Sequence, residues 1–229
     1  MKKVHRFLVK TPISGTDIFI EDKDLIHLIK NVLKLNKEEQ CILFNDKGDD
    51  HLSTIKEISK DKISLKVESI IPKKEILKNI TACISITKRD TFELVVQKLT
   101  ELGVKTILPI ISDRTIKQSL KTDRLQKISD EALEQSGGSN IVYIEEPISL
   151  KEALERTKGL KSVYFNMESP KFEKQSENDL AFYIGPEGGW SENDINLFKE
   201  YEIASYSLGE TVLRAETASI VCAYKLLWD

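Results

Sequence analysis

Hydrophobic and polar positions divide the chain into two parts with different periodicity. Before residue 71, short apolar runs alternate with polar positions as in β-strands, and apolar residues recur at helical spacing between residues 25 and 33. The predicted strands cover residues 17–20, 40–44, 51–58 and 62–70, with a hairpin turn at 45–48 between the second and the third. This part is predicted to form a small β-barrel-like module.

The rest of the chain alternates between strands and helices. Strands are predicted at 80–86, 104–110, 141–144, 162–165, 180–184 and 204–208, and helices at 91–102, 123–135, 150–157, 192–201 and 215–228. Regular alternation of this kind indicates an α/β fold with a parallel sheet and helices on both faces. Pro72 ends the last strand of the first part, so the predicted domains are residues 1–72 and 73–229.

A glycine-rich loop joins a strand to a helix in the second part. It reads Ile184-Gly-Pro-Glu-Gly-Gly189, and Ser191 with Asp194 three residues later forms a capping-box pattern at the start of the helix. Glycine permits positive φ and lets another group approach the backbone closely. The loop lacks both the Lys-Ser/Thr pair and the glycine spacing of nucleotide-binding loops, so its predicted ligand is not a nucleoside triphosphate.

A second loop, at residues 208–218, also follows a predicted strand and precedes a helix. It offers apolar side chains up to Leu213 and then the polar side chains of Arg214, Glu216 and Thr217. Ligands of open α/β sheets bind outside the carboxyl ends of strands, so the two loops are predicted to hold one mostly apolar ligand with a few polar edges. Alternatively, Gly209 is only a turn and residues 214–217 are only a helix cap.

Composition and charge are those of a globular protein, with 40% hydrophobic and 31% charged residues among 229. No apolar stretch is long enough to cross a bilayer and no signal-peptide pattern is present, which predicts a cytoplasmic protein without membrane contact. The three cysteines are scattered and far from histidine, which predicts buried free thiols and no metal site. The formal charge is +4 over residues 1–135 and −7 over residues 136–229, so a polyanion would prefer the amino-terminal portion.

Taken together, the two loops resemble those of the knotted SPOUT class of S-adenosylmethionine-dependent RNA methyltransferases. The closest family is the RsmE type, which makes 3-methyluridine in small-subunit (16S) ribosomal RNA. Weaker matches extend the resemblance over most of the chain: His5-Arg-Phe7, His27-Leu28, Val32-Leu33, Gln97-Lys98, Glu101-Leu-Gly-Val104, Ser112-x-Arg114 and Glu131-Ala-Leu-Glu-Gln135.

This resemblance implies an N-terminal PUA-like, RNA-binding β-barrel and a C-terminal trefoil-knotted SPOUT methyltransferase domain. It further implies a homodimer that binds S-adenosylmethionine in the knot and methylates small-subunit ribosomal RNA, either naked or in the assembled subunit. The cofactor contacts that it implies are Met167, Ile184, Gly185, Gly188, Gly189, Leu208, Gly209, Val212 and Leu213.

Methyl transfer to uracil N3 requires alignment of the methyl group with N3 and stabilisation of the base as its proton leaves. Arg214 is the candidate for holding charge on a uracil oxygen. Glu187 is the candidate for orienting the base or accepting the proton, with a loop-fixing carboxylate as the alternative.

A histidine base is not expected, because every histidine lies at or before residue 51. Candidates for contacts with RNA phosphate are Arg6, Lys88 and Arg114, each with a solvated surface charge as the alternative.

Four positions depart from the family pattern. Gly138 and Val142 stand where the family has arginine and proline, Thr211 replaces a basic residue, and Lys34 replaces an arginine. The departures at Gly138, Val142 and Thr211 motivate an alternative: a non-catalytic RNA-binding or ribosome-associated protein that retains the SPOUT fold. A more distant alternative is a small-molecule enzyme that uses the same loops for another cofactor.

The last predicted helix carries apolar residues over much of its circumference, which supports the homodimer implied by the resemblance. Alternatively, this helix is fully buried within its own domain. The residues concerned are Ile220, Val221, Ala223, Tyr224, Leu227 and Trp228.

Overall fold

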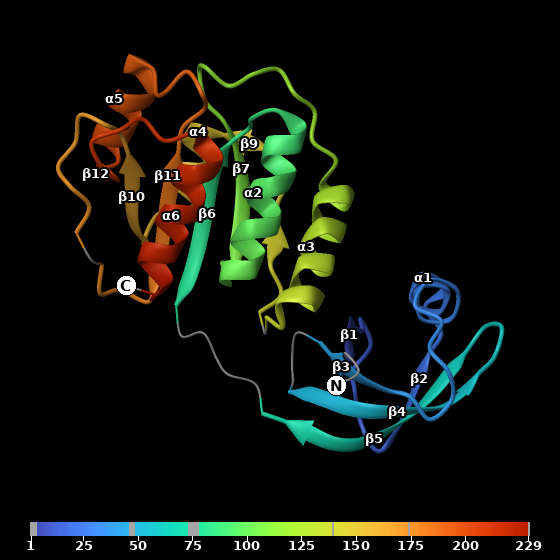
Figure 1. Cartoon of the computed structure of the whole chain (residues 1–229). Coiled ribbons are helices and arrows are strands. Elements are labelled where there is room, and N and C mark those ends of the chain that lie inside the picture. The colour runs from blue at the N-terminus through green and yellow to red at the C-terminus, as the bar shows by residue number, and fades with distance from the viewer. Residues whose placement is uncertain (1–3, 46–48, 73–77, 139, 174, 229) are drawn as a thin grey trace. The chain divides into compact units, whose positions relative to one another are not determined.

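The computed structural model describes residues 4–45, 49–72, 78–138, 140–173 and 175–228. The chain divides into two compact units, residues 1–75 and 76–229 (Figure 1). The N-terminal unit has one hydrophobic core and the C-terminal unit has two. The predicted hairpin turn at 45–48 and the predicted boundary after residue 72 involve residues 46–48 and 73–77, which lie outside the described residues.

The N-terminal unit is built on a mixed five-stranded sheet. Its strands pair in the order β1-β3-β4-β5-β2, with β1 parallel to β3 and the other neighbours antiparallel. The strands are β1 (His5–Leu8), β2 (Asp17–Ile20), β3 (Gln40–Phe44), β4 (Asp50–Ile58) and β5 (Ile63–Ile71). The sequence prediction missed β1, because its four residues include two basic side chains and show no apolar alternation.

A short helical segment packs on this sheet, and the residues that it buries differ in part from those that the sequence predicted. Helix α1 (Lys23–His27) continues into the π-helix η1 (Leu28–Val32), in which the Leu33 amide donates to the Leu28 carbonyl at 2.9 Å. Ile26 and Ile29 are buried, whereas Val32, expected on the apolar face, is 58% exposed. A π-turn holds more residues than an α-turn, so the positions after it rotate away from the core.

The C-terminal unit is built on a parallel sheet. Its described strands are β6 (Asn79–Ser85), β7 (Thr106–Ile111), β8 (Tyr143–Ile144), β9 (Ile148–Ser149), β10 (Lys161–Phe165), β11 (Asp179–Ile184) and β12 (Ala204–Tyr206). They pair in the order β12-β10-β11-β6-β7-β8, β9 also pairs with β7, and every pairing is parallel. The predicted parallel α/β architecture is confirmed, and the trefoil knot stays a prediction.

Helices cover both faces of the parallel sheet (Figure 1). They are α2 (Arg89–Leu102), α3 (Thr122–Ser136), α4 (Leu150–Arg156), α5 (Glu192–Glu200) and α6 (Ala215–Trp228). In β11, Leu180, Phe182 and Ile184 pack with residues of α2, α3 and α6, whereas Ala181 and Tyr183 pack with residues of α4 and α5. Alternate residues of one strand thus supply two separate cores, as expected for a sheet that is buried on both sides.

The three cysteines are buried free thiols, as predicted. Burial raises the pKa of Cys41 and of Cys83 to about 12, and it raises the pKa of Cys222 well above its ordinary value. Their thiolate forms are therefore scarce near neutral pH, which leaves these groups with a packing role. Within the described ranges, no helix is long and apolar enough to span a membrane.

Candidate active site

A cavity of about 300 Å³ lies where three neighbouring strands end. β10 lies between β12 and β11, and the three strands run in the same direction, so their carboxyl ends meet at one edge of the sheet. The cavity is lined by residues 165–167, which begin with the last residue of β10, by 184–187, 189 and 190, which begin with the last residue of β11, and by 207–209, 211–215 and 218 after β12. The two loops predicted to face each other do so, and a third loop closes the space between them.

Trp190 fixes the glycine-rich loop to the end of β10. Its indole Nε1 donates to the carbonyl of Phe165 at 3.0 Å, and its ring packs edge-on against Phe198. The same indole lies over Gly185, where an added Cβ would come within 3.0 Å of the Trp190 ring. Glycine is therefore favoured at position 185, because any side chain there would have to displace the Trp190 ring by a few tenths of an ångström.

Glycine is favoured at position 189 for a different reason. Its φ is +69° and its amide donates to the Pro186 carbonyl at 2.8 Å, which closes a tight turn. An added Cβ would meet no atom within 4 Å, so the constraint is the left-handed backbone and not lack of space. In the facing loop, the Ser207 hydroxyl donates to the Gly209 carbonyl at 2.8 Å and holds that turn.

Eight of the nine predicted cofactor residues line the cavity, and Gly188 does not. Its carbonyl instead accepts a hydrogen bond from Nη1 of Arg114 at 2.9 Å. The sequence prediction missed several lining residues, among them Phe165, Asn166 and Trp190. Phe165 ends a predicted strand, but only the pairing order places that strand between the two glycine loops. The lining residues that were predicted are Met167, Ile184, Gly185, Gly189, Leu208, Gly209, Val212 and Leu213.

Both predicted catalytic residues also line the cavity. Arg214 directly precedes α6, where its carbonyl accepts the Ala218 amide at 2.8 Å, and Glu187 follows Pro186 in the glycine-rich loop. Both residues are exposed. Within the part of the chain that the structure describes, neither side chain forms a hydrogen bond or an ion pair. Their charges are therefore available to a ligand in the cavity.

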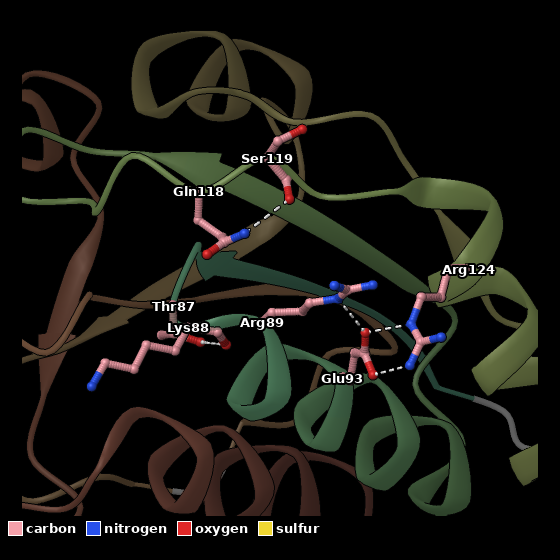
Figure 2. Close-up of polar contacts among 7 residues, drawn as sticks. All are labelled: Thr87, Lys88, Arg89, Glu93, Gln118, Ser119 and Arg124. Carbon is pink, nitrogen blue, oxygen red and sulfur yellow. Dashed lines mark hydrogen bonds and ion pairs between the residues drawn. The ribbon is translucent and has the colours of Figure 1, made fainter.

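Lys88 lies at the start of α2 beside a cluster of charged side chains that the sequence analysis did not single out. Glu93 accepts two hydrogen bonds from Arg124, at 2.6 and 2.8 Å, and one from Arg89 at 3.1 Å (Figure 2). These bonds, chiefly those from Arg124, lower the pKa of Glu93. Lys88 points away from this cluster (Figure 2) and is exposed. Two arginines share the Glu93 carboxylate here, and Glu93 first, then Asp90 and Glu131, raise the pKa of Arg124, so this surface carries charges of both signs.

Arg6 occupies a different environment from the other two candidates for RNA contacts. Its guanidinium forms a bidentate pair with Asp50, at 2.9 and 2.7 Å, and lies 3.8 Å from the centre of the Phe44 ring. The side chain is 8% exposed. A phosphate contact would require this pair to open, so we assign Arg6 to the internal packing of the N-terminal unit and do not propose the RNA contact further.

Comparison with known proteins places the chain in a family. A model of an RNA methyltransferase domain matches residues 73–227, and a model of an RNA methyltransferase PUA domain matches residues 20–68. The ribosomal RNA small subunit methyltransferase E of Rickettsia conorii is 31% identical over 204 residues, which are 85% of this chain and 83% of the relative. The chain belongs to this methyltransferase family. The member from Bacillus subtilis is 28% identical over 232 residues, which are 93% of this chain and 91% of that relative.

Solved structures agree with membership of the family. The ribosomal RNA small subunit methyltransferase E from Neisseria gonorrhoeae, bound to S-adenosylmethionine, superposes with a TM-score of 0.90 at 28% identity, covering 99% of this chain and 98% of that one. A methyltransferase from Legionella pneumophila in complex with the same cofactor gives a TM-score of 0.86 at 26% identity, with 96% of each chain covered. The RsmE-type resemblance and the PUA-like character of the N-terminal unit are confirmed.

Three of the departures from the family pattern bear on the non-catalytic alternative. Val142 is 1% exposed and belongs to the core of the C-terminal unit. Gly138 follows α3, where an added Cβ would lie 2.8 Å from Leu133 Cδ1. Neither residue lines the cavity, whereas Thr211 does. Two of these departures therefore belong to local packing, and with the family membership this favours catalysis. Among the described residues, no group of three potential metal ligands is found.

Asp50→Ala is expected to lower the free energy of unfolding by about 2 kcal/mol or more, because the mostly buried Arg6 guanidinium loses two charged hydrogen bonds. Glu38→Ala is the control, since it removes an exposed pair with Lys56 at 3.5 Å and should cost less than about 1 kcal/mol. Urea unfolding followed by circular dichroism gives both values. Equal losses in the two variants would contradict the packing role of Arg6.

Proposed function

We propose that the chain transfers the methyl group of S-adenosylmethionine to N3 of a uridine in small-subunit (16S) ribosomal RNA, in the cytoplasm. The observation that carries the proposal is the cavity at the ends of β10, β11 and β12, with two glycine turns around it and two charged side chains that form no hydrogen bond or ion pair with any described residue. Membership of the family and the cofactor-bound relatives support the same chemistry.

The lining of the cavity fits this cofactor. Gly185, Gly189 and Gly209 carry no side chain, so an adenosine or a methionine portion can approach the backbone closely at these positions. Leu208 and Leu213 supply apolar surface for the flat adenine ring of the adenosine. The cofactor supplies an electrophilic methyl group on a positively charged sulfur. The chain in turn has to hold that methyl in line with the attacking nitrogen and to keep water away from it.

Arg214 and Glu187 are the groups that would act on the uracil. In this reaction the N3 proton would leave the base, so negative charge would develop on the uracil carbonyl oxygens. The N3–methyl bond would form as the sulfur–methyl bond breaks, with S-adenosylhomocysteine as the leaving group. The Arg214 guanidinium would donate hydrogen bonds to one of these oxygens. The Glu187 carboxylate would accept the proton or orient the base. Both side chains are exposed in the free protein, and bound RNA would exclude the water that otherwise screens them.

Contacts with the RNA backbone are proposed for Lys88 and for Arg114. In Arg114, Nη1 is bound to the Gly188 carbonyl, and the proposed contact uses the other guanidinium nitrogens. Lys88 stands at the start of α2 in a surface region that also carries Arg89 and Arg124. The N-terminal unit, which matches a PUA domain model, is proposed to bind the same RNA. Such contacts position the substrate without reading its sequence.

Gly189→Val is expected to weaken binding of S-adenosylmethionine at least tenfold while the fold is retained. Valine strains a backbone with φ of +69°, by about 1–2 kcal/mol, and relief of the strain moves the cavity wall. Gly159→Val is the matched control, because Gly159 also has positive φ and open space but lies between α4 and β10. Calorimetric titration gives the affinities. Equal affinities in the two variants would mean that the Gly189 turn is not part of the cofactor site.

Arg214→Ala is expected to lower turnover by roughly 100-fold or more and to leave cofactor affinity within about threefold, because it removes one preorganised charge from the transition state. Mass spectrometry of nucleosides from 16S ribosomal RNA of a deletion strain, complemented with each variant, supplies the measurement. Arg156→Ala, which removes an exposed arginine on α4, should restore full methylation.

Two outcomes of this experiment would overturn different statements. If the deletion strain keeps its 3-methyluridine, the substrate assignment is wrong and the non-catalytic alternative gains support. If Arg214→Ala restores full methylation, the role of Arg214 is wrong and Glu187 becomes the next group to replace.

A homodimer is proposed from the outer face of α6. Tyr224 and Trp228 are 51% and 56% exposed, and Ile220, which is partly buried, lies one turn before Tyr224 on the same side of the helix. Leu94 of the neighbouring α2 is also exposed. The alternative of a helix fully buried in its own domain does not account for these side chains. A second copy of the chain is the proposed cover for this stripe.

Light scattering after size exclusion is expected to give twice the mass of 26.1 kDa at micromolar concentration. Tyr224→Glu, which places a charge in the stripe, should shift the mass towards the monomer. Glu200→Gln on α5 should leave it unchanged. A wild-type monomer under these conditions would contradict the proposed dimer.

A further inference from the structure

The turn after β7 contacts the glycine-rich loop at several points. In this turn the Ser112 amide donates to Thr115 Oγ1 at 2.9 Å, and the Thr115 amide donates to the Ser112 carbonyl at 3.0 Å. Ser112 is 6% exposed, and its hydroxyl lies 3.4 Å from the hydroxyl of Ser85 at the end of β6. The turn therefore continues β7 directly and also contacts the end of β6.

Asp113 in this turn binds the start of α5, where the glycine-rich loop ends. Its Oδ2 accepts from the Ser191 hydroxyl at 2.7 Å and from the Asn193 amide group at 3.0 Å, and its own amide donates to Asp194 Oδ1 at 3.3 Å. These bonds, that from Ser191 first, lower the pKa of Asp113. The Ser191 hydroxyl also accepts the Asp194 amide at 3.0 Å, so one hydroxyl caps the helix and binds Asp113.

Arg114 binds the other end of the same segment. Its Nη1 donates to the Gly188 carbonyl at 2.9 Å. Its Cβ and Cδ would each lie 3.6 Å from a Cβ added at Gly188, so the arginine stem runs alongside the loop. Gly189 and Trp190, which line the cavity, thus lie between an attachment at Gly188 and one at Ser191.

We infer that Asp113 and Arg114 are positioning residues that hold the wall of the cofactor cavity in its binding conformation. The inference rests on the proposed function, because it takes S-adenosylmethionine as the occupant of the cavity. Neither side chain lines the cavity, so each acts through Gly188, Ser191 and Asn193. A loop that is already ordered loses less conformational entropy on binding than a loop that must be ordered by the ligand.

Two variants separate positioning from other roles. Asp113→Asn keeps the shape but turns the acceptor of two hydrogen bonds into a partial donor, and Arg114→Met keeps most of the stem but removes the bond to Gly188. Each is expected to weaken S-adenosylmethionine binding about tenfold, measured by calorimetry without RNA, and to raise the KM for the cofactor equally. The kcat at saturating cofactor and saturating RNA should stay within about twofold, because the groups that would contact the uracil are unchanged; loss of the proposed Arg114 contact with RNA phosphate would raise only the KM for RNA.

Matched controls come from α4. Glu152→Gln changes a capping carboxylate that accepts from Ser149, and Arg156→Met removes an exposed arginine paired with Glu145 at 2.7 Å. Both controls should bind the cofactor like the wild type. Arg114→Lys can still donate to the Gly188 carbonyl and should recover most of the affinity lost in Arg114→Met. If Arg114 only contacted RNA through its charge, Arg114→Met would leave the affinity for S-adenosylmethionine, measured without RNA, unchanged. It would raise only the KM for RNA.

The outcomes distinguish this inference from the proposed function. A wild-type chain that binds no S-adenosylmethionine at millimolar concentration would overturn the proposed function, and the inference with it. A wild-type chain that binds the cofactor, with Asp113→Asn and Arg114→Met binding equally well, would overturn only the inference. If Asp113→Asn fails to fold, Arg114→Met and Arg114→Lys, which leave Asp113 and α5 intact, decide the question alone.

Discussion

The parallel pairing of β10 with both β11 and β12 is the constraint on which the candidate site depends. Strands that run in the same direction in one sheet end at the same edge, so the chain after each of them enters the same space. Residues far apart in sequence, such as Phe165, Gly189 and Leu213, therefore line one cavity. No single loop forms the site, and its shape depends on the hydrogen bonds that keep the three loops in register.

The loops carry little regular structure, so specific side chains replace the ladder bonds that a strand would provide. Trp190 connects the β11 loop to the end of β10, and the Ser207 hydroxyl holds the turn at Gly209. The Phe172 amide, from the segment that follows β10, donates to the Ser207 carbonyl at 2.9 Å. Each bond satisfies a polar group close to an apolar cavity, where an unsatisfied one would cost about 1–3 kcal/mol. The same bonds thus satisfy buried polar atoms and fix the geometry of the site.

The periodicity of the sequence was sufficient to predict most elements of the C-terminal unit, because each has a strong pattern of its own. Helix α6 was predicted at 215–228 and extends over Ala215–Trp228. Strand β8 is shorter than the predicted 141–144, since Val142 packs into the core before pairing begins. Patterns of this kind report which residues face a core and not which strands are neighbours. The two glycine loops were therefore recognisable from sequence, whereas the position of β10 between them, and with it Phe165 and Trp190 as lining residues, was not.

Arginine shows most clearly what sequence alone leaves open. Arg6, Arg114 and Arg214 carry the same side chain, but the fold uses the first in a bidentate pair with Asp50 and the second in a bond to Gly188. Arg214 alone of these three has no hydrogen-bond or ion-pair partner among the described residues, and its exposure makes this tolerable, because water solvates the guanidinium in the free protein. When a ligand displaces that water, the same charge acts at lower effective dielectric and interacts more strongly with developing negative charge. A candidate for chemistry is therefore distinguished from a candidate for packing by two features together. The charged group forms no internal pair among the described residues, and it lies at the edge of a cavity.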